Sequence, residues 1–156
     1  MNFKIEILTK KCFENSRGKN MLSKIYSMHI NGIKKVEYSP LYVIGGNISF
    51  DEARIIAADL LSDKITETYA IAESDQHCKI SSPILSMIEV WYKKNVTDTV
   101  SESIIKAVKD LGISKKFKIK TGHKYYLYGR ISKAVLSRIT TKLLANTLIQ
   151  EYKIIK

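Results

Sequence analysis

Hydrophobic and polar positions alternate in several short stretches of the chain, a pattern that is typical of β-strands. In the second half, residues 88–92 alternate loosely and are rich in strand-forming side chains. Residues 117–120 alternate again, and residues 125–128 continue the pattern after a turn that we expect at Thr121 and Gly122. Residues 148–154 form a last stretch of this kind. These stretches predict the strands of one small unit.

Between these strands the hydrophobic period lengthens to that of an amphipathic helix. Thr99 and Glu102 have the spacing of a capping box, and Gly112 is placed to end the first helix. Ser132 is placed to cap a second helix. The inner faces of the two helices are expected to carry Val100, Ile104, Val108, Leu111, Val135, Leu136, Ile139 and Leu143. The second half therefore follows the order β-α-β-α-β.

The first half repeats this order, with a capping box of Ser49 and Glu52 predicted for its second helix, and some of its residues return 83 positions later. Residues 5–11 return as 88–94, and residues 60–63 return as 143–146. A shared offset at both ends favours a tandem duplication.

In the middle of the two copies we expect the register to slip by one to three residues, so that Gly32 matches Gly112 and Gly45 matches Gly129. Gly45 and Gly46 lie between a strand and a helix, where backbone N–H groups could meet a phosphate. The surrounding sequence is neither a dinucleotide-binding motif nor a P-loop. A turn that requires positive φ is the favoured interpretation.

The predicted fold class is α/β, an α+β two-layer sandwich. Two tandem β-α-β-α-β units are expected to pack as a pseudo-dimer with a mainly antiparallel sheet, because each copy of about 70 residues is near the lower limit for an independent core. The predicted first copy spans residues 1–73, and the second spans residues 86–156. Residues 74–85 are polar, contain Ser-Ser-Pro and are expected to form the linker.

The composition excludes several classes of protein. Of 156 residues, 45% are hydrophobic and 26% are charged, which is globular rather than disordered composition. Cys12 and Cys78 make no disulfide framework or metal-ligand motif, and His29, His77 and His123 have no suitably spaced partners. We therefore expect no catalytic or metal site. No apolar run is long enough for a membrane span or a signal peptide, so a cytoplasmic protein without membrane contact is expected.

The net charge of +11 is carried by the second half of the chain. Residues 1–78 hold 10 basic and 10 acidic side chains, whereas residues 79–156 hold 16 and 5. A basic run with interleaved tyrosines includes Lys115, Lys116, Lys118, Lys120, Lys124, Tyr125, Tyr126, Tyr128 and Arg130. Such a face suits single-stranded nucleic acid, but the aromatic-rich signature of RNA-recognition domains is missing. A solvated lysine face, or a surface for an acidic protein partner, is favoured over nucleic acid.

The second copy resembles the PurS subunit of phosphoribosylformylglycinamidine synthase, the ligase of purine biosynthesis. The residues that carry the resemblance are 88–90, 94–98, 104–108, 111–112, 120–124 and 143–152. The most specific stretch is Leu-Leu-Ala-Asn-Thr-Leu-Ile-Gln-Glu-Tyr at residues 143–152, close to the family's Leu-Leu-Ala-Asn-Pro-Val-Ile-Glu-Asp-Tyr. Thr99 and Thr147 stand where the family has proline, and Lys120 stands where it has arginine. The first copy retains residues 60–63 and Tyr69 but lacks the basic segment.

The resemblance implies a fused pair of PurS-like units, equivalent to the homodimer of ordinary members. In the family, a separate glutaminase releases ammonia and a large ATP-dependent synthetase uses it. The PurS subunit bridges the two and assists ammonia transfer. By this resemblance our chain is not catalytic alone and binds no cofactor, while ATP, Mg and glutamine are used by the partner subunits. A further homodimer is compatible with it.

The same resemblance suggests Lys120, Lys124 and Asn146 as contacts to a partner or its ligand. Asn146 could equally cap or turn the chain. Two other functions remain open at this point. One is a single-stranded nucleic-acid-binding module that uses the Lys/Tyr face of the second copy. The other is a regulatory domain that binds a small metabolite between the copies.

Overall fold

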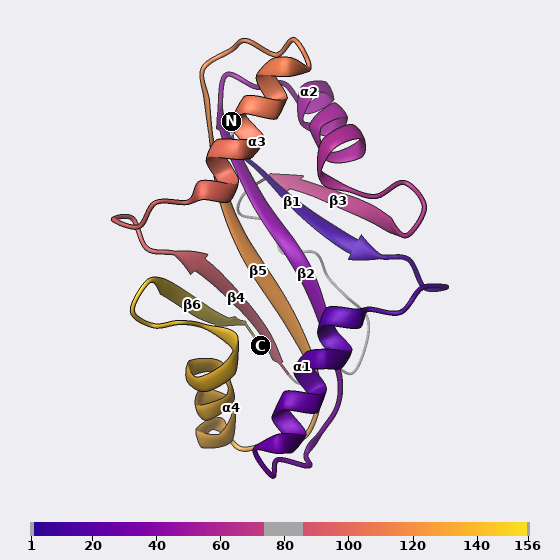
Figure 1. Ribbon diagram of the computed structural model, residues 1–156, viewed down its shortest axis with the longest axis vertical. Coiled ribbons are helices and arrows are strands. Elements are labelled where there is room, and N and C mark those ends of the chain that lie inside the picture. The colour runs from indigo at the N-terminus through magenta and orange to yellow at the C-terminus, as the bar shows by residue number, and fades with distance from the viewer. Residues whose placement is uncertain (1, 74–85, 156) are drawn as a thin grey trace. The chain divides into compact units, whose positions relative to one another are not determined.

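A computed structural model describes residues 2–73 and 86–155, which alternate between strands and helices (Figure 1). The elements of the first half are β1 (Asn2–Thr9), α1 (Ser16–Ser27), β2 (Ile33–Gly46), α2 (Phe50–Ile55), the π-helical segment η1 (Ile56–Leu61) and β3 (Glu67–Glu73). Those of the second half are β4 (Ser86–Tyr92), α3 (Thr99–Asp110), β5 (Phe117–Gly129), α4 (Lys133–Ile139), the π-helical segment η2 (Thr140–Leu144) and β6 (Gln150–Ile155).

The strands form a six-stranded sheet in the order β3-β1-β2-β5-β4-β6. β1 pairs antiparallel with both β2 and β3, so that Ile5 lies opposite Tyr42 on one side and Ile71 on the other. β4 pairs antiparallel with β6, and Ile88 lies opposite Ile154. The predicted fold class, an α+β two-layer sandwich with a mainly antiparallel sheet, is confirmed.

The described residues divide into two compact units, and each unit takes elements from both predicted sequence copies. Unit 1 comprises residues 2–13, 40–73 and 97–122. Unit 2 comprises residues 14–39, 86–96 and 123–155. Unit 1 therefore includes α3 from the second half, and unit 2 includes α1 from the first half. The long strands β2 and β5 each contribute residues to both units.

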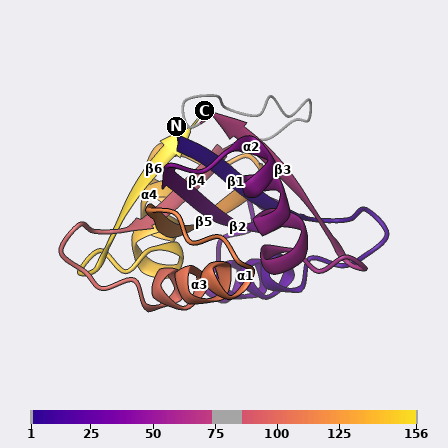
Figure 2. The same ribbon diagram turned by 90° about the horizontal axis from the view of Figure 1, so that it is seen from above.

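In unit 1, α2 and α3 lie on one face of the strands (Figure 2). The core includes Ile5 and Ile44 from the sheet, Ile56 from η1 and Val108 from α3, all four fully shielded from solvent. Alternate residues of β1 point to opposite faces, so the neighbours of Ile5 lie on the face without these helices. The burial of both Ile56 and Val108 explains why η1 and α3 are in contact.

In unit 2, α1 and α4 pack against the strands in the same way. Ile25 of α1 and Ile139 of α4 are fully buried against Ile88, Val90 and Leu127 from the strands. The inner face predicted for α4 is confirmed, since Leu136 and Ile139 are buried and Val135 and Leu143 pack against the same cluster. On α3 the prediction is right only for Ile104 and Val108, because Val100 and Leu111 are 48% and 46% exposed.

Equivalent hydrogen bonds show that the 83-residue offset is constant along the chain. Lys10 donates to the carbonyl oxygens of residues 64 and 65, and Lys93 donates to those of residues 147 and 148. In the middle of the halves, Asn15 binds the backbone of Tyr38, and the equivalent Asp98 binds Thr121. The register slip expected there is therefore wrong. At the ends of β2 and β5, Gly129 corresponds to Gly46 and not to Gly45, and both Gly46 and Gly129 have positive φ.

The helix ends obey the same offset. His29 and Gly112, 83 residues apart, both adopt positive φ just after α1 and α3. The predicted stop at Gly112 is confirmed, but its counterpart is His29 and not Gly32. The capping box of Ser49 with Glu52 and the cap at Ser132 are confirmed, and these residues too are 83 apart.

Two local predictions in the second half are wrong. The cap of α3 is Asp98, whose carboxylate accepts the N–H of Ser101, and not Thr99. Thr121 and Gly122 form no turn but continue β5 as a single strand. Both errors have one cause, because the Asp98 side chain also accepts the N–H and the hydroxyl of Thr121 and so holds the middle of β5 extended. His123 consequently lies in the strand rather than in a turn.

Candidate functional site: a basic cavity in unit 1

Unit 1 contains a cavity of about 830 Å³ along the first half of β5. Its lining comes from β1, the end of β2, the last turns of α3, the connection after α3 and β5. The residues are Asn2, Val43, Gly45, Gly46, Ile105, Lys109, Ser114, Lys115, Lys116, Phe117, Lys118 and Lys120. All charged side chains in this lining are lysines.

The alternation of β5 explains how several lysines reach the cavity. Ile119 and Thr121 are buried at 6% and 5% exposure, so Lys118 and Lys120 extend from the opposite face of the strand and are exposed. The backbone is held in place beside them by a hydrogen bond from the N–H of Asn47 to the carbonyl oxygen of Lys116. The lysine run seen in the sequence is thus spread over the connection after α3 and the strand β5.

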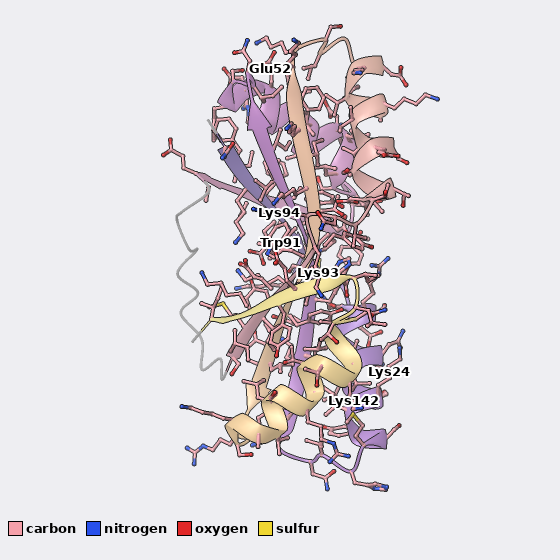
Figure 3. The ribbon with its side chains drawn as sticks, turned by 90° about the vertical axis from the view of Figure 1, so that its left-hand side faces the viewer. Lys24, Glu52, Trp91, Lys93, Lys94 and Lys142 are labelled. Carbon is pink, nitrogen blue, oxygen red and sulfur yellow. The ribbon has the colours of Figure 1, made fainter. Side chains whose placement is uncertain are left out.

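Glu52 neutralises one of the lysines. The Nζ atom of Lys115 lies 2.9 Å from the carboxylate of Glu52 on α2 (labelled in Figure 3). The N–H of Ser49, followed by Lys115, holds the pKa of Glu52 below its usual value. Within residues 2–73 and 86–155, no carboxylate pairs with Lys109, Lys116, Lys118 or Lys120. The cavity is therefore strongly positive.

The three residues predicted from the sequence are not brought together in one unit. Lys120 lines the cavity of unit 1, whereas Lys124 and Asn146 belong to unit 2. Lys124 is only 3% exposed, and its Nζ lies 5.0 Å from the centre of the Tyr126 ring. Of the two predicted lysines, Lys120 is the one that a ligand or partner can reach directly.

Asn146 organises the turn before β6. Its Oδ1 accepts the N–H of Leu148, and its backbone carbonyl accepts the N–H groups of Ile149 and Gln150. The turn is also held by Lys93 (labelled in Figure 3), whose Nζ donates to the carbonyl oxygen of Thr147 at 2.6 Å. The turn role, one of the two interpretations of Asn146, is therefore confirmed, while its contact with a partner stays a prediction.

Sequence reasoning missed a smaller polar pocket in unit 2, of about 280 Å³. Among its lining residues is Tyr38, whose hydroxyl accepts a hydrogen bond from Arg17 at 2.8 Å and lies 2.7 Å from Nδ1 of His123. Burial raises the pKa of Tyr38, although the neighbouring Arg17 opposes this effect. No local motif links these three residues, because they come from α1, β2 and β5 and meet only in the folded chain.

The tyrosines of the predicted Lys/Tyr face are not available to stack on bases. Tyr125 and Tyr126 are 7% and 2% exposed, and burial raises the pKa of Tyr125 to about 12. Tyr128 is partly buried and donates a 2.6 Å hydrogen bond from its hydroxyl to Glu37. Because base stacking needs exposed rings, this arrangement removes the main support for a single-stranded nucleic-acid module.

Chemistry-bearing clusters are sparse elsewhere. Among residues 2–73 and 86–155, no three or more His, Cys, Asp or Glu side chains are grouped so that they could hold a metal ion. Cys12 is exposed and free, while Cys78 and His77 lie outside the described residues. In the same described part of the chain, no helix has both the length and the apolar character that a membrane span requires.

The fold is that of a small α+β protein, with a lysine-lined cavity in unit 1. Comparison with protein families gives a more particular answer, because the family model described as "PurS: Phosphoribosylformylglycinamidine (FGAM) synthase" matches residues 86–156. The resemblance predicted for the second copy is thereby confirmed, and it supports a role in FGAM synthase and purine biosynthesis. A comparison of the chain with curated proteins found no match.

Proposed function

We propose that the chain is the small, non-catalytic subunit of FGAM synthase. In this function it bridges the glutaminase and the large ATP-dependent synthetase and assists the transfer of ammonia between them. ATP, Mg and glutamine are then used by those partners, and the complex works in the cytoplasm. The observation that carries the proposal is the PurS match over residues 86–156.

The first half supports the proposal by its structure. At the constant offset of 83 residues it repeats the caps, the lysine bridges and the strand ends of the matched half. We infer that it is a second, diverged PurS-like unit, so that one chain takes the place of a homodimer. The different surfaces of the two halves would let one chain meet two different partners.

The basic side chains suggest where one partner binds. Lys120 is exposed and has no carboxylate partner among the described residues, so it can meet an acidic surface without first breaking an ion pair. Charged groups of this kind direct association and fix the orientation of a complex. Lys124 and Asn146 belong to unit 2, where they would act through the position of the second part of β5 and of the turn before β6.

Co-expression of the chain with both partner subunits tests the proposal. We expect a stable three-part complex and glutamine-dependent FGAM formation only when all three chains are present. Free ammonium should restore FGAM formation without our chain, because it bypasses the transfer step. If no complex forms with ATP and glutamine supplied, or if the glutamine-dependent reaction runs equally well without the chain, the bridging function is wrong.

A charge reversal then locates the surface. Lys120→Glu should weaken the complex by about tenfold, whereas Lys142→Glu on η2 removes and adds the same charges and should have no effect (Figure 3). Equal losses in both variants would show that only the net charge matters.

A further inference from the structure

The cavity of unit 1 has a property that bridging does not require. Five lysines line it, and only Lys115 has a carboxylate partner, Glu52, among the described residues. Placing like charges around one concave space raises its positive potential and concentrates anions there. Such an arrangement suits a ligand that carries several negative charges.

The rest of the lining is apolar or backbone. Val43, Ile105 and Phe117 contribute hydrophobic surface, and Gly45 and Gly46 expose the main chain at the end of β2. Gly46 has a φ of +126°, and a Cβ atom there would approach the carbonyl oxygen of Lys116 to 2.7 Å. The backbone is thus held close to the start of β5, where only glycine fits.

The equivalent positions of unit 2 show that the hollow is not a necessary feature of the fold. Gly45 corresponds to Tyr128 and Lys109 corresponds to Tyr26, each 83 residues apart. The hydroxyl of Tyr26 donates to the carbonyl oxygen of Ile33, and that of Tyr128 donates to Glu37. In unit 2 these rings occupy the positions that unit 1 gives to a glycine and a lysine.

The charges at equivalent positions also differ between the two units, and unit 1 is the more basic one there. Lys120 corresponds to Glu37, which forms a 2.7 Å ion pair with Lys35, and Lys116 corresponds to the fully buried Ile33. At these positions unit 2 pairs Lys35 with Glu37, whereas unit 1 leaves four lysines without carboxylate partners in the described part of the chain. At the compared positions, the volume and the unpaired charge thus occur together in unit 1.

We propose that the cavity of unit 1 binds a nucleoside polyphosphate. The phosphates are neutralised by Lys116, Lys118 and Lys120, and the base packs on the apolar wall that includes Ile105 and Phe117. A volume of about 830 Å³ lies within the usual range of small-molecule sites and accommodates a ligand of this size. The site shares Lys120 with the proposed partner surface, but binding of a nucleotide by the isolated chain does not depend on the bridging function.

Titration calorimetry on the isolated chain tests the site, with ATP, tripolyphosphate and adenosine as separate probes in EDTA. We expect ATP to bind at least tenfold more tightly than either of the other two, since only ATP uses both the lysines and the apolar wall. Tripolyphosphate binding as tightly as ATP would overturn the assignment to a nucleotide. A single-stranded RNA that binds more tightly than ATP, or no binding at millimolar ATP, would overturn it as well.

Lysine variants distinguish a site from diffuse attraction. The triple variant Lys116→Ala, Lys118→Ala, Lys120→Ala should lose ATP binding by about tenfold per lysine. The matched control, Lys133→Ala, Lys142→Ala, Lys153→Ala, removes the same charge from exposed positions of unit 2 and should bind ATP as the natural chain does. Equal losses in both triple variants would overturn the site.

A variant without any charge change completes the test. Gly45→Tyr places in unit 1 the residue that unit 2 has at the equivalent position, and its Cβ would meet only the Asn2 side chain within 4 Å. Combined with Asn2→Ala, it should fill the cavity and abolish ATP binding while Tm is retained. Asn2→Ala alone should still bind ATP. If ATP binds normally to the folded double variant, the ligand lies elsewhere and the proposal is wrong.

Discussion

Unit 1 and unit 2 use the same backbone plan, but they differ in what they place between the strands and the following helix. At equivalent positions unit 1 has Gly45 and Lys109, and unit 2 has Tyr128 and Tyr26. The hydrogen bonds that shape the chain recur at a constant offset, while the side chains around the cavity do not. The comparison teaches that the capping and turn residues maintain the fold in both units. The side chains between the strands and the following helix can differ, so that they leave a cavity in unit 1 and fill the equivalent positions in unit 2.

The largest effect on stability is expected for substitution of Asp98, the residue that caps α3. Asp98 accepts hydrogen bonds from Ser101 and Thr121, and thereby ties a helix to the middle of β5. Asp98→Ala should lower the free energy of unfolding by about 2–3 kcal/mol, because a cap and charge-assisted hydrogen bonds are lost together. Urea denaturation followed by circular dichroism measures this change.

Asn15 is the residue of unit 2 that corresponds to Asp98. It makes the equivalent cap to Gly18 and binds both the N–H and the carbonyl oxygen of Tyr38. Asp98→Asn, which installs the unit 2 residue in unit 1, should cost only about 1 kcal/mol, since most of the hydrogen bonds can be remade. A loss as large as that of Asp98→Ala would show that the negative charge, and not the cap geometry, stabilises unit 1.

A smaller effect on stability is expected for Tyr128, the residue that unit 2 has at the position of Gly45. Burial alone would raise the pKa of Glu37, but hydrogen bonds from Lys35 and Tyr128 outweigh it and lower that pKa. Tyr128→Phe keeps the ring and removes the hydroxyl, so it should destabilise the protein by about 1–1.5 kcal/mol near pH 7. A lowered carboxyl pKa stabilises the fold above the unfolded value of about 4.3, and this contribution is lost as pH falls through the lower folded value.

The difference between the natural chain and Tyr128→Phe should therefore shrink as the pH falls below about 4. Chemical denaturation at a series of pH values from 7 to 3 measures it. Tyr152→Phe removes a hydroxyl from an exposed ring of β6 and should change stability little at any of these pH values. A penalty for Tyr128→Phe that stays constant with pH would mean that its bond to Glu37 is not the cause.

The predictions from sequence succeeded where the determining contacts are local. The capping box of Ser49 with Glu52 depends on residues three apart, and the fold class follows from periodicities within single elements. The cap of α3 was misplaced at Thr99 because the choice of Asp98 depends on Thr121, 23 residues away. The same long-range bond removed the turn that the Thr-Gly pair indicated.

The candidate site could be predicted only in part for a similar reason. The lysine run and Lys120 were visible in the sequence, since they lie in β5 and in the residues just before it. The cavity was not visible, because its other walls come from β2 and α3, and their small or flexible residues matter only once they meet. Nothing in a linear pattern shows that Tyr128 is packed and hydrogen-bonded rather than exposed for stacking.

The smallest effect is expected where the two helices end. His29 has a φ of +58°, and the equivalent Gly112 has a φ of +88°, a region that glycine occupies without steric cost. His29→Gly should leave the protein as stable as before or raise its free energy of unfolding by up to about 1 kcal/mol, because relief of this strain competes with the greater entropy of a glycine in the unfolded chain. Gly112→Ala should lower it by about 1 kcal/mol, and since no atom lies within 4 Å of the added Cβ, the loss would come from the backbone alone. Thermal denaturation of the two single variants measures both changes, and a clear stabilisation by Gly112→Ala would contradict the equivalence of the two helix ends.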